Sequence, residues 1–322
     1  MGRALVTGIT GQTGSYLGEM LVAEGWEVHG LVRAADAAAA TLSTTQPSVQ
    51  LHTGDLADDE ALARLVDDVE PDAIFNLGGQ SSVARSWELP AETARITALP
   101  VAVLLEAAWR WQQRRQAPVA FVQASSAEVF GNPTESPQTE RTPILPANPY
   151  GAAKAYGHEL VEVYRERGLA ASSCILFNHE SPRRPATFVT RKITLAAARI
   201  SLGLQERLTL GNLDARRDWG WAPDYARALE LAAAEPGTYV IATGRAHSVH
   251  DFVRVAFESA GVEDWADRVD SDSSFARQGD AAEQVGDATR ARERLGWAPT
   301  MDFEQIVTAM VQADLAAESD AH

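Results

Sequence analysis

Three glycines spaced three residues apart follow an apolar run near the start of the chain, and they constrain its fold more than any other feature. Residues 3–9 have the apolar character of a strand, Gly8, Gly11 and Gly14 follow, and residues 15–24 have the apolar spacing of a helix. In such a strand–loop–helix unit, one glycine permits the tight turn, one lets a pyrophosphate approach the backbone, and one lets the helix pack on the strand. The spacing is G-x-x-G-x-x-G, and it predicts a dinucleotide site; a purely structural glycine turn is the alternative.

The end of the second predicted strand, residues 27–33, bears on the choice of cofactor. An acidic residue at this end would bind the free ribose hydroxyl of NAD, whereas an arginine suits the 2′-phosphate of NADP. Arg33 occupies the position. We therefore expect NADP, with NAD as the alternative and a surface arginine as the simpler interpretation.

Strands and helices continue to alternate along the first half of the chain. Further strands are expected at 49–55, 72–78, 120–126 and 173–178, and helices at 58–69, 91–113 and 150–165. This alternation predicts an α/β fold with a doubly wound parallel sheet. Residues 1–178 would form an NADP-binding Rossmann domain, with sheet contributions from about 208–244. Residues 179–322 would mainly form a smaller, interleaved substrate-binding lobe, with a polar loop at 179–185, helices at 188–203, 249–260 and 303–316, and strands at 208–211 and 239–244.

Charge and composition narrow the class of protein. A net charge of −16 argues against a general nucleic-acid partner. No apolar run reaches about 18 residues, so no membrane partner is expected, and the first residues enter a strand pattern, which leaves no signal peptide. The single cysteine, Cys174, fits a reducing cytoplasm. The pairs Arg183-Arg184, Arg191-Lys192 and Arg216-Arg217 favour an anion site over scattered surface charge.

Four residues in the middle of the chain form a candidate catalytic set. Tyr150 and Lys154 share one face of a predicted helix, so the ammonium group could lower the pKa of the phenol and make it a base for a hydroxyl. Ser126 and Glu128 stand at and just after the end of the strand 120–126. The Tyr–Lys spacing alone is also common on solvated helix faces, and Glu128 could be an ordinary surface glutamate.

With these motifs in order, the chain resembles the extended short-chain dehydrogenase/reductase family. Three segments make it similar to the GDP-mannose 4,6-dehydratase branch: Phe177-Asn-His-Glu-Ser-Pro-Arg-Arg184, Phe188-Val-Thr-Arg-Lys192 and Leu210-Gly-Asn-Leu-Asp-Ala-Arg-Arg217. The resemblance spans about residues 3 to 315. It implies a nucleotide-sugar 4,6-dehydratase, a lyase that oxidises C4, eliminates water across C5 and C6, and returns the hydride to C6. Tyr150 and Lys154 would act at the 4-hydroxyl, Ser126 would bind near O4, and Glu128 would remove the C5 proton.

The resemblance also implies the binding residues, without a metal site. The cofactor set is Gly8, Thr10, Gly11, Gln12, Thr13, Gly14, Arg33, Asp55, Leu56, Leu77, Gly78, Gln80, Tyr150, Lys154, His179 and Arg184. Asp55 could instead belong to the N-cap region of the following helix. The substrate set is Ser81, Ser86, Ser126, Glu128, Asn178, Val189, Lys192, Arg217, Arg277 and Asp280. Lysine and arginine in this set would bind the diphosphate of a nucleotide-diphosphate sugar.

Two departures from the branch leave alternatives open. Its usual Arg-Arg-Ser-Ser-Ser segment, which reaches a neighbouring subunit, begins here at Arg33 and continues with alanines and Asp36, so we expect a homodimer in place of a tetramer. Ser82 and Arg85 replace its histidine and valine near the sugar, so a sugar other than mannose is possible. A 4-epimerase or 4-reductase is the alternative enzyme, and a non-catalytic NADP-binding regulator is the alternative outside catalysis.

Overall fold

A seven-stranded parallel sheet forms the centre of the molecule. The computed structural model describes residues 2–34, 36–272 and 281–321. The strand order is β10-β6-β5-β4-β1-β2-β3, so the order reverses beside β1, which is where doubly wound sheets bind ligands. The strands are β1 (Arg3–Thr7), β2 (Glu27–Val32), β3 (Gln50–Thr53), β4 (Ala73–Asn76), β5 (Ala120–Ser126), β6 (Ala170–Leu176) and β10 (Thr238–Ile241).

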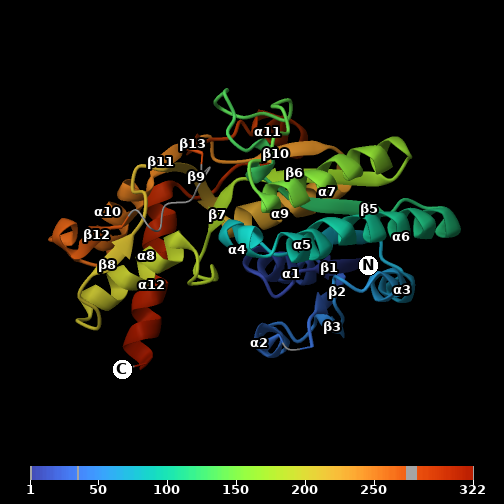
Figure 1. Cartoon of the computed structure of the whole chain (residues 1–322). Coiled ribbons are helices and arrows are strands. Elements are labelled where there is room, and N and C mark those ends of the chain that lie inside the picture. Colours follow the sequence, from blue (N-terminus) through green and yellow to red (C-terminus); the bar gives the residue numbers. More distant parts are fainter. Residues whose placement is uncertain (1, 35, 273–280, 322) are drawn as a thin grey trace.

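Helices cover both faces of this sheet (Figure 1). Alternate residues of β1 explain why: Ala4 and Val6 belong to one buried apolar cluster and Leu5 to another. The first cluster includes residues of α1 (Gln12–Ala23), α2 (Ala37–Thr45), α9 (Ala222–Ala234) and α11 (Thr289–Leu295). The second includes residues of α3 (Asp59–Val69), α6 (Leu99–Arg115) and α7 (Pro149–Glu166). Because both faces are buried, the strands are apolar on both sides, as the sequence indicated.

The single helix predicted at 91–113 is interrupted. The structure has α4 (Val83–Glu88), α5 (Pro90–Thr93) and a π-helical turn η1 (Ala94–Ala98) before α6. Pro100 lies at the start of α6 and has no N–H group to donate to the preceding turn. A wider turn accommodates this missing hydrogen bond, a constraint that apolar spacing does not reveal.

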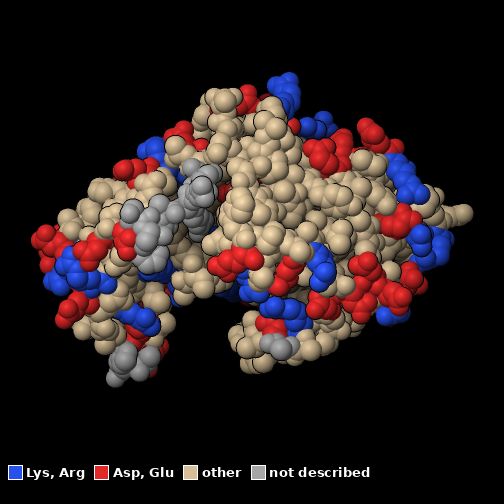
Figure 2. Space-filling model, viewed as in Figure 1, with Lys and Arg blue, Asp and Glu red and all other residues tan. Residues whose placement is uncertain are grey.

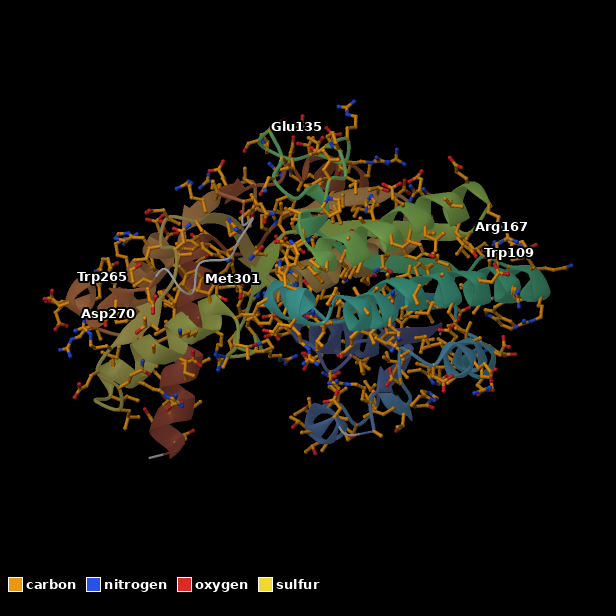
Figure 3. The ribbon with its side chains drawn as sticks, in the orientation of Figure 1. Trp109, Glu135, Arg167, Trp265, Asp270 and Met301 are labelled. Atoms are coloured by element: carbon orange, nitrogen blue, oxygen red, sulfur yellow. The ribbon has the colours of Figure 1, made fainter. Side chains whose placement is uncertain are left out.

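The smaller lobe contains two small sheets and its own core (Figure 1). One sheet has β7 (Asn178–Glu180), β9 (Arg216–Trp221), β11 (Ala246–Ser248) and β13 (Glu283–Gln284); the other pairs β8 (Leu208–Leu210) with β12 (Val269–Ser271). The helices are α8 (Val189–Ser201), α10 (Val249–Ser259), the short η3 (Trp265–Arg268) and α12 (Phe303–Ala321). Trp219 stacks on Phe303 and meets Phe252 edge-on in the core, and the labelled Trp265 and Met301 pack around it (Figure 3).

The chain leaves the central sheet to build much of this lobe and then returns. After β6 it forms β7, α8, β8 and β9, and α9 and β10 bring it back, with β10 beside β6. Of the residues 208–244, β10 therefore joins the central sheet, whereas β8 and β9 lie in the lobe. His179 and Glu180, predicted as the start of a polar loop, instead join Asn178 in the strand β7, which pairs with β9. No helix in the described part of the chain is both long and apolar enough to cross a membrane.

Candidate active site

The glycine loop has the close backbone packing that the sequence predicted. Gly8 has φ +69°, a left-handed conformation that favours glycine, and its carbonyl accepts from the N–H of Gly11 at 3.0 Å. A Cβ atom added at Gly14 would lie 2.2 Å from the Gly8 oxygen, so only glycine fits at the first turn of α1. The backbone at this helix N-terminus is suited to an anion such as a pyrophosphate.

The β7 segment is bonded directly to the first turn of α1. The Nδ1–H of His179 donates to the Phe177 carbonyl at 2.8 Å, so Nε2 is left to accept from the Thr13 hydroxyl at 2.7 Å. Gln12 donates to the His179 carbonyl at 2.9 Å and accepts from Ser181 at 2.8 Å. Burial lowers the pKa of His179 to about 4, and the positive charge of Arg184 acts in the same direction. His179, Gln12 and Thr13 thus join the lobe to the glycine loop.

A buried polar network joins the carboxyl ends of β1 and β4 to the middle of β5. Thr7 donates to Asn76 at 2.6 Å, and the Asn76 amide donates to Gln123 at 2.8 Å. Thr7 also accepts from the backbone N–H of Gly78 at 2.9 Å. These bonds fix the strand ends on either side of the point where the strand order reverses. The sequence interpretation missed this network, although the polar residues at the ends of apolar strands were its signal.

Lys154 points from α7 to the end of β5. Its Nζ donates to the Ala124 carbonyl at 2.8 Å, and burial lowers its pKa to about 8. The next hydroxyl on the strand, Ser125 Oγ, is buried without a hydrogen-bond partner among the described residues. The buried ammonium of Lys154 and the unpartnered hydroxyl of Ser125 both lie near the carboxyl end of β5. Such buried polar groups fit a polar ligand such as a nicotinamide cofactor.

Tyr150 lies in the first turn of α7 and is buried. Burial raises its pKa to about 12; a hydrogen bond with Ser126 and the charge of Arg184 lower it, and the charge of Glu128 raises it. Lys154 is not among these influences, and its ammonium lies 5.9 Å from the centre of the tyrosine ring. The lowering of the Tyr150 pKa that was expected from Lys154 therefore comes from Ser126 and Arg184.

Glu128 lies beside Tyr150 through local structure. It is in the 3-10 turn η2 (Ala127–Phe130), directly after β5, and its backbone N–H donates to Ser126 Oγ at 3.3 Å. The carboxylate accepts from the amide of Asn148 at 2.7 Å, two residues before Tyr150. A half-buried carboxylate, a serine hydroxyl and a buried phenol are thus brought together from β5, η2 and α7.

The end of β2 has two charged residues with opposite preferences for the cofactor. Arg33 is exposed immediately after the strand. Asp36 is the N-cap of α2, accepting from the Ala38 N–H at 3.0 Å, and also accepts from the hydroxyl of Thr10 in the glycine loop at 2.8 Å. The N-cap residue of α2 is thus in direct contact with the glycine loop.

Two residues of the predicted cofactor set, Asp55 and Leu56, follow β3. Asp55 is exposed and accepts from the N–H of Ala57 at 2.9 Å, whereas the N-cap of α3 is Asp58. Leu56 is half-buried, and its Cδ1 would lie 2.9 Å from a Cβ atom added at Gly78. Leu56 and Gly78 are therefore adjacent, although they come from different connections of the sheet.

The loop after β4 uses much of its polar capacity internally. Leu77 packs against the apolar cluster of the α1 face. The Gln80 side chain bonds to both backbone groups of Ser82 and to Thr93. Ser81 is exposed, whereas Ser86 is fully buried and donates to the Val83 carbonyl at 2.6 Å. Of the two predicted sugar contacts, only Ser81 is open to solvent in this conformation.

The three basic pairs are distributed over different contacts instead of forming one uncompensated cluster. Their ion pairs are Arg183–Glu19, Arg184–Glu180, Arg191–Asp314 and Arg216–Glu283. Lys192 donates to the backbone carbonyl of Thr209, and Arg217 donates to that of Ala281.

The remaining predicted substrate residues lie in or beside the lobe. Asn178 begins β7 and pairs with Trp219, and Val189 begins α8. Both are half-buried. Arg277 and Asp280 lie outside the described residues. Within the described ranges, no three histidine, cysteine, aspartate or glutamate side chains are grouped as metal ligands.

Comparisons with known proteins agree on the type of protein. The family model described as GDP-mannose 4,6 dehydratase matches residues 5–310. GDP-mannose 4,6 dehydratase 1 of Arabidopsis thaliana is 44% identical over 324 residues, covering 97% of this chain and 89% of that protein. The human GDP-mannose 4,6 dehydratase is 41% identical, covering 97% of this chain and 91% of that protein. Among solved structures, the UDP-glucose 4-epimerase of Thermus thermophilus in complex with NAD aligns with a TM-score of 0.84 and 26% identity, covering 98% of this chain and 99% of that one.

Proposed function

Because the chain belongs to the GDP-mannose 4,6-dehydratase family, we propose that it converts GDP-mannose to the GDP-linked 4-keto-6-deoxy sugar. It is a hydro-lyase of the extended short-chain dehydrogenase/reductase type. The observation that carries this proposal is the position of Glu128 beside Tyr150. The two side chains are close enough that the charge of Glu128 raises the pKa of Tyr150. An elimination needs a second base beside the residue that acts on the hydroxyl, and Glu128 is that base.

The residues divide the proton transfers between them. Tyr150 takes the proton from the 4-hydroxyl, assisted by the hydrogen bond with Ser126 and by the charge of Arg184. Lys154, whose ammonium lies 5.9 Å from the centre of the tyrosine ring, would add its charge once substrate and cofactor are bound. Oxidation at C4 makes the C5 proton acidic, and the Glu128 carboxylate removes it. The electron pair left at C5 forms the C5–C6 double bond, and the 6-hydroxyl leaves as water with the proton that Glu128 took from C5. C5 regains a solvent-exchangeable proton, through Tyr150, when C6 is reduced. When bound, the nicotinamide cofactor supplies the hydride acceptor for C4 and the hydride donor for C6.

The cofactor proposed is NADP, bound over the glycine loop. Arg33 supports it, because a guanidinium group at the end of β2 can pair with the 2′-phosphate. Asp36 favours NAD, because its carboxylate is bonded to Thr10 of the same loop and would repel a phosphate. Calorimetric titration of the protein with NADP and NAD, and of the variants Arg33→Ala and Asp36→Ala, separates the two. If NADP is the cofactor, Arg33→Ala should weaken the binding of NADP and leave the binding of NAD unchanged. Tighter binding of NAD than of NADP by the unmodified protein would exclude NADP as the cofactor.

The proposed diphosphate contacts are Lys192 and Arg217. The positively charged nitrogens of both side chains can make charge-assisted hydrogen bonds to phosphate oxygens. Asn178 and Val189 would contact the nucleotide from β7 and α8. His179 would act on the cofactor indirectly, through Thr13, because both of its ring nitrogens have protein partners.

A homodimer is proposed through α7 and the helices beside it. Tyr156 and Val163 of α7 are 45% and 56% exposed, and Leu99 at the start of α6 and Trp87 of α4 are 49% and 57% exposed. The surface over α7 in Figure 2 also has few charged side chains. A second copy using the same face would bury these side chains. Val163→Glu should give a monomer by light scattering; Leu204→Glu, at a 44% exposed leucine of the lobe, is the control and should not. A monomeric unmodified protein would exclude the dimer.

Mass spectrometry after incubation with GDP-mannose and NADP tests the reaction itself. Dehydration predicts a product lighter by one water, with no net consumption of cofactor. A product of unchanged mass and altered stereochemistry would indicate an epimerase, and stoichiometric oxidation of NADPH would indicate a reductase. The same assay with other GDP-sugars defines the hexose.

A further inference from the structure

Asn148 contacts both parts of the candidate active site with one side chain. Its amide nitrogen donates to Glu128 Oε2 at 2.7 Å, and its amide oxygen accepts from the backbone N–H of Gly151 at 2.8 Å. The second bond makes Asn148 the N-cap of α7, the helix whose first turn contains Tyr150. One planar amide therefore connects the proposed elimination base to the helix that contains the proposed hydroxyl base.

The backbones around this amide are also in close contact. A Cβ atom added at Gly151 would lie 2.4 Å from the Glu128 carbonyl oxygen. The N–H of Leu145 donates to the Val129 carbonyl at 3.0 Å, and a Cβ atom added at Gly131 would lie 2.1 Å from the Leu145 oxygen. The two ends of the loop 131–148 are thus packed together, while the labelled Glu135 lies at its outer part (Figure 3).

This packing fixes the backbone of Glu128 but not its carboxylate. A glutamate side chain has three rotatable bonds, and a half-buried one can turn toward solvent unless a donor holds it. The amide of Asn148 is such a donor, and a hydrogen bond to a carboxylate is charge-assisted. Asn148 therefore selects one orientation of Glu128 relative to Tyr150.

We propose that Asn148 is a positioning residue for the elimination step, and that it orients the Glu128 carboxylate independently of its role as a helix cap. The proposal rests on the proposed dehydratase function. Asn148 touches neither the hydroxyl nor the reacting carbons in this argument; it acts through Glu128. Its loss should therefore slow removal of the C5 proton while oxidation at C4 continues.

Two variants separate the two contacts. Asn148→Ser keeps an oxygen that can cap α7 but removes the donor to Glu128, whereas Asn148→Ala removes both. Single-turnover reactions with GDP-mannose and NADP would follow absorbance at 340 nm for C4 oxidation, deuterium uptake at C5, and loss of water by mass. We expect Asn148→Ser to oxidise C4 within about twofold of the normal rate and to take up C5 deuterium and lose water about 10- to 100-fold more slowly. Asn148→Ala should show the same slow step and, unlike Asn148→Ser, a Tm lower by about 2–4 °C.

Three results would overturn the proposal. Deuterium uptake at the normal rate in Asn148→Ser would mean that Asn148 only caps the helix. Equal slowing of C4 oxidation and deuterium uptake would indicate a general structural defect. If the unmodified protein removes no water from GDP-mannose, the proposed function fails. The positioning role of Asn148 is then decided separately, by comparing crystal structures of the unmodified protein and of Asn148→Ser. A Glu128 side chain that turns away in Asn148→Ser supports that role, and an unchanged one refutes it.

Discussion

The ammonium nitrogen of Lys154 donates a 2.8 Å hydrogen bond to the backbone carbonyl of Ala124. This bond links the catalytic helix α7 to the end of β5, and burial lowers the pKa of the lysine to about 8. Since an unburied lysine has a pKa of 10.5, the unfolded chain binds more protons than the folded one between about pH 8 and 10.5. The contribution of Lys154 to stability therefore increases as the pH rises through this range.

Replacing Lys154 by methionine should remove this pH dependence. Over pH 8 to 10.5 the stability of the unmodified protein should rise relative to Lys154→Met by up to about 3 kcal/mol, measured by urea unfolding. The variant should also lose about 100-fold or more in kcat/KM at pH 7, because the charge that assists Tyr150 is gone. A constant stability difference across the range would show that the lysine has an ordinary pKa.

Glu128→Gln should uncouple the two halves of the reaction. The amide keeps the size of the side chain but cannot accept the C5 proton, so C4 oxidation should persist while water loss falls by about 1,000-fold or more. Absorbance at 340 nm and product mass report the two steps, and cofactor binding by calorimetry should be unchanged. Glu293→Gln, at an exposed position of α11, is the control. Normal release of water by Glu128→Gln would remove Glu128 from the mechanism.

Acid should destabilise the protein through His179. Its folded-state pKa is about 4 against an ordinary 6.5, so the folded chain binds fewer protons between these values and loses stability as the pH falls from 6.5 to 4. The shift corresponds to about 3 kcal/mol, and protonation at Nε2 would also end its acceptance of the Thr13 hydrogen bond. The free energy of unfolding, measured with urea, should fall between pH 7 and pH 4 by about 3 kcal/mol less in His179→Gln than in the unmodified protein. The exposed His250, changed to glutamine, should leave the acid sensitivity unaltered.

Two glycines of α7 should differ in how well they tolerate substitution by alanine. At Gly151 the new methyl group would meet the Glu128 carbonyl at 2.4 Å, and backbone atoms cannot move aside without separating η2 from α7. At Gly157 it would meet only the end of the Val101 side chain, at 2.9 Å. Gly151→Ala should therefore lower stability by about 2 kcal/mol or more and impair water loss, whereas Gly157→Ala should be close to neutral because better helix propensity offsets the contact. Thermal unfolding and the mass assay measure both; equal effects would contradict this account.

Several elements were predictable because one local signal determines each of them. The strand predicted at 120–126 matches β5, and the helix predicted from Tyr150 matches α7 to within one residue at each end. Gly8 and Gly14 were identified from spacing alone, and their backbone contacts confirm the tight turn. Trp109 and Trp111 near the end of α6 contact the α3–α6 core, and Arg167 lies over the Trp109 ring at 3.5 Å (Figure 3).

Other features depend on partners far away in the chain. β9 was interpreted only as a basic cluster, because its strand character comes from pairing with β7, β11 and β13. The helix α9, which begins with Ala222 and Pro223, was not predicted from the sequence. The contacts of Asn148 with Glu128 and of Lys154 with Ala124 require the fold of the loop 131–148 and the packing of α7 on β5, which no residue spacing specifies.

The return of the chain to the central sheet at β10 has a consequence for synthesis on the ribosome. β6 is complete at Leu176, but its neighbour β10 begins only at Thr238, about 60 residues later. At translation rates of roughly 5–20 residues per second, the edge of β6 stays unpaired for several seconds in the nascent chain. An unpaired edge strand can recruit strands from other chains. Chaperone dependence during expression, and aggregation of fragments that end before residue 238, follow from this order of assembly.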